Sequence, residues 1–163
     1  MILAAHIIFA SAVSSAVRFS LPGAFLFGFV SHHLLDFIPH LDAGSFWPVE
    51  DQKSGKMSRR VWILVLSDVL ASLGFLIWYG WGLKANLPLL FWASLGAALP
   101  DLLITGFPFF ISQLRSWPPL RRYEKFHYIF FRKSRPVSME GRWVLGNLST
   151  LLIIGFSFWL LLK

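Results

Sequence analysis

The sequence predicts an all-α protein, a polytopic membrane helix bundle of about five transmembrane helices that forms a single domain over residues 1–163. Hydrophobic residues make up 56% of the chain and charged residues only 14%, whereas a soluble domain carries about 25% charged residues. Several apolar runs approach the roughly 20 residues that a helix needs to cross a bilayer. Cysteine is absent, which excludes disulfides and thiolate metal sites.

The expected spans follow one another at residues 2–17, 21–40, 61–82, 87–112 and 143–162. The first lacks the basic amino-terminal stretch of a signal peptide, so we expect it to be retained as a helix. Trp62 and Trp78 bracket the third span as interfacial aromatic residues do. The helix between them covers about 24 Å, which fits a membrane crossing.

The distribution of Lys and Arg predicts the orientation. Twelve of these residues lie in two long connections, 41–60 and 113–142, and three lie elsewhere. The positive-inside rule then places both connections and the amino terminus in the cytoplasm and the carboxyl terminus outside. The net charge of +7 is explained by this topology and by contact with anionic lipid headgroups, so we expect membrane lipids as partners and no nucleic acid.

With this orientation, the ionisable residues of the spans fall toward the cytoplasmic side. They are His6, His33, Asp36, His40, Asp68 and Asp101, followed in the connections by Asp42 and His127. Such residues are costly in lipid, so they face the bundle interior and often mark function. At 100° per residue, His33, Asp36 and His40 share one helix face, and His32 points further round. Pro39 can end this helix, and His40 would then approach from a loop.

Imidazole and carboxylate ligands suit Zn, Mn or Fe, and a carboxylate-rich site suits Mg or Mn. The donors outnumber the ligands of one tetrahedral ion, which is compatible with a two-ion site. Asp36, Asp68 and Asp101 are the expected catalytic carboxylates. The basic and aromatic segment 113–142 offers Arg121, Arg122 and Lys125 to a substrate phosphate, or alternatively to lipid headgroups.

Small residues in two spans favour close helix packing. They are Ala24 and Gly28 in the second span, and Ser67, Ala71 and Gly74 in the third.

The early histidine, the element "GFVSHHLLDFIPHLD", the element "LGAALPDLL" and the later "FHYIF" resemble a group of small bacterial integral-membrane proteins. These proteins are described as membrane-bound metal-dependent hydrolases, and the group includes an SOS-regulated inner-membrane protein. The resemblance implies an inner-membrane location and the candidate metal ligands His6, His32, Asp36, His40, Asp101 and His127. It selects His32 where the helix angles favour His33, so both remain candidates. The group often shows PD-x-D, whereas Leu102 and Leu103 follow Asp101 here.

These observations together predict a hydrolase that uses one or two divalent ions at the cytoplasmic membrane face, on a phosphoester or lipid-linked substrate. One alternative is a non-enzymatic membrane scaffold or partner-binding protein, in which the polar cluster only ties helices together. The other is an ion- or proton-handling transporter. The outer halves of the first, third and fifth spans contain no carboxylate or imidazole, which argues against a transporter.

Overall fold

The computed structural model describes residues 2–40, 58–83, 85–133 and 139–163 of the chain. Most of these residues are helical, and the ranges contain no strand, which confirms the all-α prediction. The α-helices are α1 (Leu3–Val17), α2 (Leu21–Asp36), α4 (Arg59–Ile77), α5 (Leu87–Asp101), α6 (Phe107–Phe110), α7 (Pro118–Lys133) and α8 (Met139–Leu161). Asp42 lies outside the described residues.

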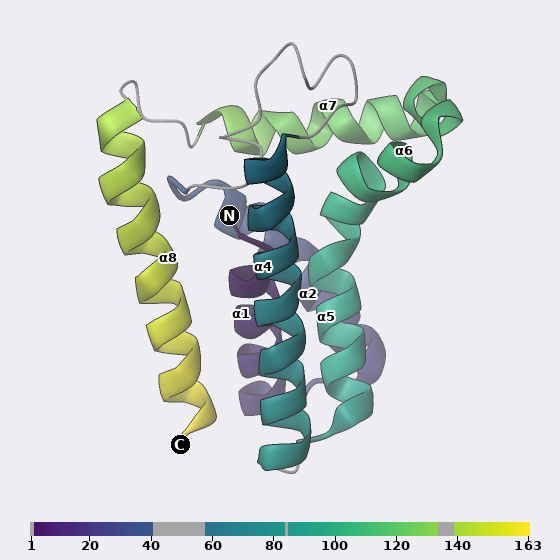
Figure 1. The fold of residues 1–163 in the computed structure, drawn as a ribbon. Helices are drawn as coiled ribbons and strands as arrows, with labels where there is room; N and C mark the ends of the chain where they lie inside the picture. Colours follow the sequence, from purple (N-terminus) through teal and green to yellow (C-terminus); the bar gives the residue numbers. More distant parts are fainter. Residues whose placement is uncertain (1, 41–57, 84, 134–138) are drawn as a thin grey trace.

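Helices α1, α2, α4, α5 and α8 run along a common direction, and α7 crosses one end of the bundle (Figure 1). Helix α1 lies in the middle, in contact with α2, α4, α5 and α8. Its side chains are small or apolar and mostly buried. His6 of α1 and His127 of α7 both lie beside Asp36, the last residue of α2. The carboxyl end of α2 and the amino end of α1 therefore both lie toward the end of the bundle that α7 covers.

Three helical stretches are long and apolar enough to cross a membrane, namely Arg59–Gly82, Leu87–Phe110 and Val144–Leu161. Leu66, Leu70 and Leu73 of α4 point outward, as lipid-facing side chains would. Helix α1 is apolar but has only 15 residues, and α2 has 16. The number of five crossings therefore stays a prediction.

The closest helix contact joins α2 and α5. A Cβ atom on Gly28 would overlap the Ala93 carbonyl oxygen and lie 2.9 Å from the Ala97 amide nitrogen. A Cβ atom on Gly96 would likewise overlap the backbone of Phe25. Because neither glycine carries a side chain, the two backbones approach as small residues allow in membrane bundles.

The small residues of α4 are placed differently. Ser67 and Ala71 are exposed, and a Cβ atom on Gly74 would meet no atom within 4 Å. The expected close packing thus involves the small residues of α2 and α5, whereas those of α4 face outward.

Much of the connection 113–142 is helical. Helix α5 continues through a π-helical turn (Leu102–Gly106) into α6, and a 3₁₀ turn (Ser112–Ser116) leads to α7. On α7, Leu120 and His127 are buried, whereas Arg121, Arg122 and Lys125 are exposed. This amphipathic pattern turns one face of α7 toward the bundle.

Candidate metal centre

A cluster of imidazoles surrounds the carboxylate of Asp36, the last residue of α2. The Oδ1 atom of Asp36 lies 3.3 Å from Nε2 of His6 and 3.7 Å from Nε2 of His40. Its Oδ2 atom lies 3.2 Å from Nε2 of His32 and 3.5 Å from Nε2 of His127. All five residues are buried. The cluster joins α1, α2, the turn after α2 and α7.

Asp101 of α5 adds a second carboxylate, whose Oδ1 atom lies 3.6 Å from Nε2 of His32. The Asp101 side chain is 43% exposed, whereas that of Asp36 is only 3% exposed. Pro100 precedes Asp101, and a π-helical turn follows it; such turns are frequent at functional sites. A small molecule can therefore approach the cluster from the side on which Asp101 lies.

Two imidazoles are oriented by backbone carbonyls. Nδ1 of His32 lies 2.7 Å from the Ala97 carbonyl oxygen, and Nδ1 of His40 lies 2.7 Å from the Ile38 carbonyl oxygen. A carbonyl oxygen only accepts, so each Nδ1 carries the hydrogen, and in the neutral ring each Nε2 presents its lone pair to the cluster. This is the arrangement that outer partners impose on metal-binding histidines.

His6 stacks on His32, with ring centroids 4.0 Å apart. Its two ring nitrogens and Nε2 of His32 are buried and make no hydrogen bond to any described residue. Buried polar atoms without partners are rare and costly, and an ion bound at the site is one explanation of them.

The local sequence explains how α2 builds this site. Ala24, Gly28, His32 and Asp36 are spaced by four residues and lie on one face of α2. The two small residues let α5 approach, so the next residue of the stripe, His32, reaches the Ala97 carbonyl. Helix α2 then ends at Asp36, as Pro39 predicts, and His40 follows outside the helix.

These residues form two groups of donors close enough to hold a metal ion, His6 with His32 and Asp36, and His32 with Asp101 and His127. Within each group the donor atoms lie within 4.8 Å of one another. Burial lowers the pKa of His127 to about 4, so its imidazole is neutral at pH 7 and able to act as a ligand. The cluster is therefore a set of donors that could hold a metal ion.

His33 does not join either group. Its Nε2 atom lies 3.2 Å from the hydroxyl of Tyr123 on α7, and its ring packs edge-on against Phe29. Burial raises the pKa of Tyr123, so the hydroxyl stays protonated, and it donates to Nε2 of His33 or accepts from it according to the tautomer of the ring. Between the two alternatives that the sequence left open, the structure places His32 in the cluster and His33 beside it. Tyr123 was missed, although it lies four residues before His127 on the same helix face.

Asp68 is also outside both groups. Its carboxylate accepts hydrogen bonds from the amides of Leu3 and Ala4, at 2.6 and 2.8 Å. These amides open α1 and have no acceptor within the helix, so the carboxylate of α4 caps α1. Asp68 therefore makes a structural contact, and it does not lie among the donors of the metal cluster, where it was expected from the sequence.

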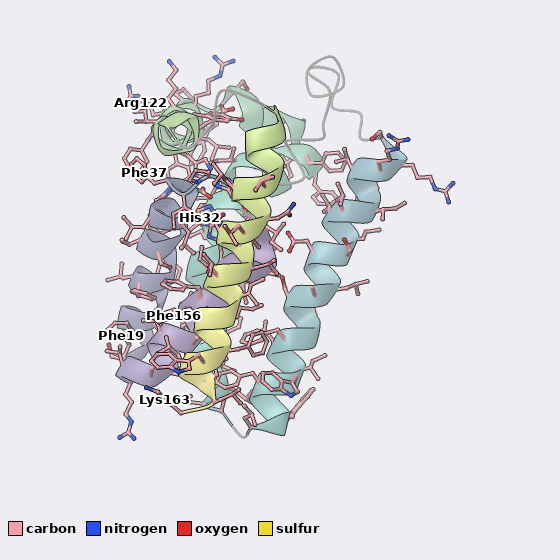
Figure 2. The ribbon with its side chains drawn as sticks, turned by 90° about the vertical axis from the view of Figure 1, so that its left-hand side faces the viewer. Phe19, His32, Phe37, Arg122, Phe156 and Lys163 are labelled. Carbon is pink, nitrogen blue, oxygen red and sulfur yellow. The ribbon has the colours of Figure 1, made fainter. Side chains whose placement is uncertain are left out.

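The predicted phosphate-binding residues Arg121, Arg122 and Lys125 lie on the exposed face of α7. Figure 2 shows Arg122 on the side of α7 that faces away from His32. The three cations therefore do not point into the cluster, and their binding to a substrate phosphate or to lipid headgroups stays a prediction.

Comparison of the chain with protein-family models, with curated proteins and with solved structures gives no match. The function must therefore be argued from the chemistry of the cluster.

Proposed function

We propose that this chain is a membrane-embedded, metal-dependent hydrolase that acts at the membrane face covered by α7. The observation that supports the proposal is the convergence of four imidazole Nε2 atoms on the two oxygens of Asp36, at 3.2 to 3.7 Å. When His32 and His40 are neutral, each points an Nε2 lone pair at this carboxylate, and two facing acceptors repel each other unless a cation lies between them. A cation at the centre would satisfy the facing lone pairs together.

The separations between donor atoms suit a tetrahedral ion. Metal–nitrogen and metal–oxygen bonds of about 2.0–2.1 Å place neighbouring ligand atoms about 3.3 Å apart. The separations from Asp36 Oδ2 to His32 and to His127 are 3.2 and 3.5 Å, and that from His32 to Asp101 is 3.6 Å. We assign the first ion to Asp36, His32 and His127, and Asp101 lies beside the position that these three ligands leave for water or substrate.

A second ion would require Asp36 to bridge. His32 has one lone pair at Nε2, because its Nδ1 hydrogen points to the Ala97 carbonyl, so it can serve only one ion. The other oxygen of Asp36 faces His6 and His40. These three donors would hold a second ion with one position left for water or substrate.

A bound divalent ion would supply a water of lowered pKa and would polarise a phosphoryl oxygen. In hydrolysis the attacking water loses a proton and the leaving oxygen gains one. Asp101 carries the exposed carboxylate of the cluster and is placed to take this proton. Exposed rings of Phe107, Phe110 and Trp117 follow Asp101 along the chain, so the substrate we propose is a phosphoester with an apolar, lipid-like part.

Metal content of the detergent-purified protein tests the proposal. We expect at least one Zn, Mn, Fe or Mg ion per chain, lost in His32→Ala and Asp36→Asn. His33→Gln is the matched control, since it changes the neighbouring histidine outside both donor groups, and it should keep the metal. A purified protein that takes up no metal on reconstitution, or a His32→Ala variant that binds as His33→Gln does, would contradict the metal assignment.

The hydrolase assignment needs a separate readout. Phosphoester hydrolysis should depend on added metal and should fall at least about 100-fold in Asp101→Asn if Asp101 carries the proton. The scaffold interpretation uses the same residues, because the cluster joins four separate elements. It predicts that Asp36→Asn lowers the unfolding temperature equally with and without metal, and that no metal-dependent hydrolysis is found.

A further inference from the structure

A polar cavity lies at the other end of α1, in the half of the bundle opposite α7. Its volume is about 350 Å³, and its polar lining residues are Ser15, Arg18, Tyr79 and Asn86. They come from the end of α1, the π-helical turn after α4 and the start of α5. The helix from His6 to Arg18 is about 18 Å long, so this cavity is separate from the metal cluster.

The cavity presents hydrogen-bond donors and a positive charge. Arg18 is exposed, and the segments that reach this end, within residues 1–35, 69–100 and 141–163, contain no Asp or Glu. The side-chain oxygen of Asn86 accepts from the amide of Leu89 at 3.1 Å, which leaves the Asn86 amide hydrogens for a ligand. Tyr79 lines the same cavity. This donor set selects an anion, and the planar Arg fork matches phosphate.

The backbone of Arg18 is strained. Its φ of 60° is the only positive value at a non-glycine residue in the described parts of the chain. Arg18 ends α1 in the left-handed conformation, where glycine is the usual residue because it has no Cβ atom. Strained residues of this kind cluster at ligand sites. Glycine would end the helix with less strain, so the Arg18 side chain serves a purpose other than ending α1.

The surroundings of the cavity indicate an amphiphile rather than a free ion. Phe19 and Leu89 provide apolar walls. Trp78 and Trp81 are exposed on the turn that also carries Tyr79, and exposed tryptophans at the end of an apolar helix mark headgroup depth. We propose that this cavity binds the phosphate of a phospholipid in the leaflet opposite the metal cluster, with Arg18 holding the phosphate.

Native mass spectrometry of the full chain in nonionic detergent tests this site. The probes are dioleoylphosphatidylglycerol, dioleoylglycerol and inorganic phosphate. Arg18→Gly removes the side chain but suits the positive φ, so the variant should fold and keep its metal. It should weaken the tightest phosphatidylglycerol adduct about 10- to 100-fold, the range for one charge-assisted contact. Arg18→Lys should keep part of the affinity, because lysine retains the charge and loses the fork.

Two matched variants separate this site from general attraction to anionic lipid. Lys163→Gln removes a cation from the same end of the molecule (Figure 2), and Arg60→Gln removes one from the first turn of α4, at the opposite end (Figure 1). Neither should change the tightest adduct. Equal binding by Arg18→Gly and Lys163→Gln would overturn the proposal. Equal binding of dioleoylglycerol, or displacement of the lipid by an equal concentration of inorganic phosphate, would also overturn it.

Discussion

The geometry of the cluster depends on a contact that contains no polar side chain, the approach of α2 and α5 at Gly28. Substitution of Gly28 by alanine adds one methyl group that would overlap the Ala93 carbonyl oxygen and lie 2.9 Å from the Ala97 nitrogen. Carbon and oxygen atoms in close contact are about 3.3 Å apart. Helices α2 and α5 must therefore separate by about 1 Å to accept the methyl group.

That separation acts on His32, which lies one helical turn further along α2. Its Nδ1 atom is 2.7 Å from the Ala97 carbonyl oxygen, and a shift of about 1 Å would lengthen the contact beyond hydrogen-bonding range. Overpacking costs about 1–3 kcal/mol, and the lost hydrogen bond about 0.5–1.5 kcal/mol. Loss of an outer partner of a metal-binding histidine typically weakens metal affinity about 10- to 100-fold.

Gly28→Ala should therefore lower both the free energy of unfolding and the affinity for Zn²⁺, measured by denaturation and by competition with a chelating dye. Gly96→Ala should act similarly, because its methyl group would overlap the Phe25 backbone. Gly74→Ala is the control, since a Cβ atom there meets nothing within 4 Å. If Gly28→Ala binds Zn²⁺ as tightly as Gly74→Ala does, the reasoning from helix contact to metal affinity is refuted.

Two further substitutions separate structural contacts from metal binding. Asp68→Asn should lower the free energy of unfolding by about 1–2 kcal/mol, because a charged cap of α1 is lost, with the metal stoichiometry at saturating Zn²⁺ unchanged. Loss of metal at unchanged stability would instead make Asp68 a ligand. Tyr123→Phe should lower the free energy of unfolding by about 0.5–1.5 kcal/mol, because the hydrogen bond to His33 is lost. The variant should keep its metal. Loss of metal would show that α7 needs this hydrogen bond to position His127.

The fold class and the depth of the polar residues could be predicted from the sequence. Apolar runs separated by polar connections predict a helical bundle, because each helix satisfies its own backbone hydrogen bonds within the membrane. The orientation by Lys and Arg placed His6, Asp36, Asp101 and His127 at one end, and the structure brings these four residues to one cluster. The depth of a residue in the bundle follows from its position along the helix, so it could be predicted from the sequence.

The direction of each side chain was harder to predict. The helix angles favoured His33 because they treated residues 33–40 as one helix, whereas α2 ends at Asp36 and His40 approaches from the turn. The decisive signal was the stripe of Ala24 and Gly28, which marks the face that α5 covers and continues through His32. Small residues identify the packed face of a membrane helix more reliably than the polar residues themselves.

Asp68 shows a different limit. A carboxylate inside an apolar helix suggests a partner on another side chain, and sequence patterns offer only side chains as candidates. The partners are instead the amides of Leu3 and Ala4, groups that every helix start exposes whatever its sequence. The cap fixes the start of α1 a few residues before His6, which lies against Asp36. Asp68, which is partly buried, thus caps the helix that carries the ligand candidate His6, while Asp36 forms the centre of the cluster. The two aspartates have different roles, because Asp68 faces the amides that open α1 and Asp36 faces imidazoles. Their depth in the bundle could not distinguish these roles.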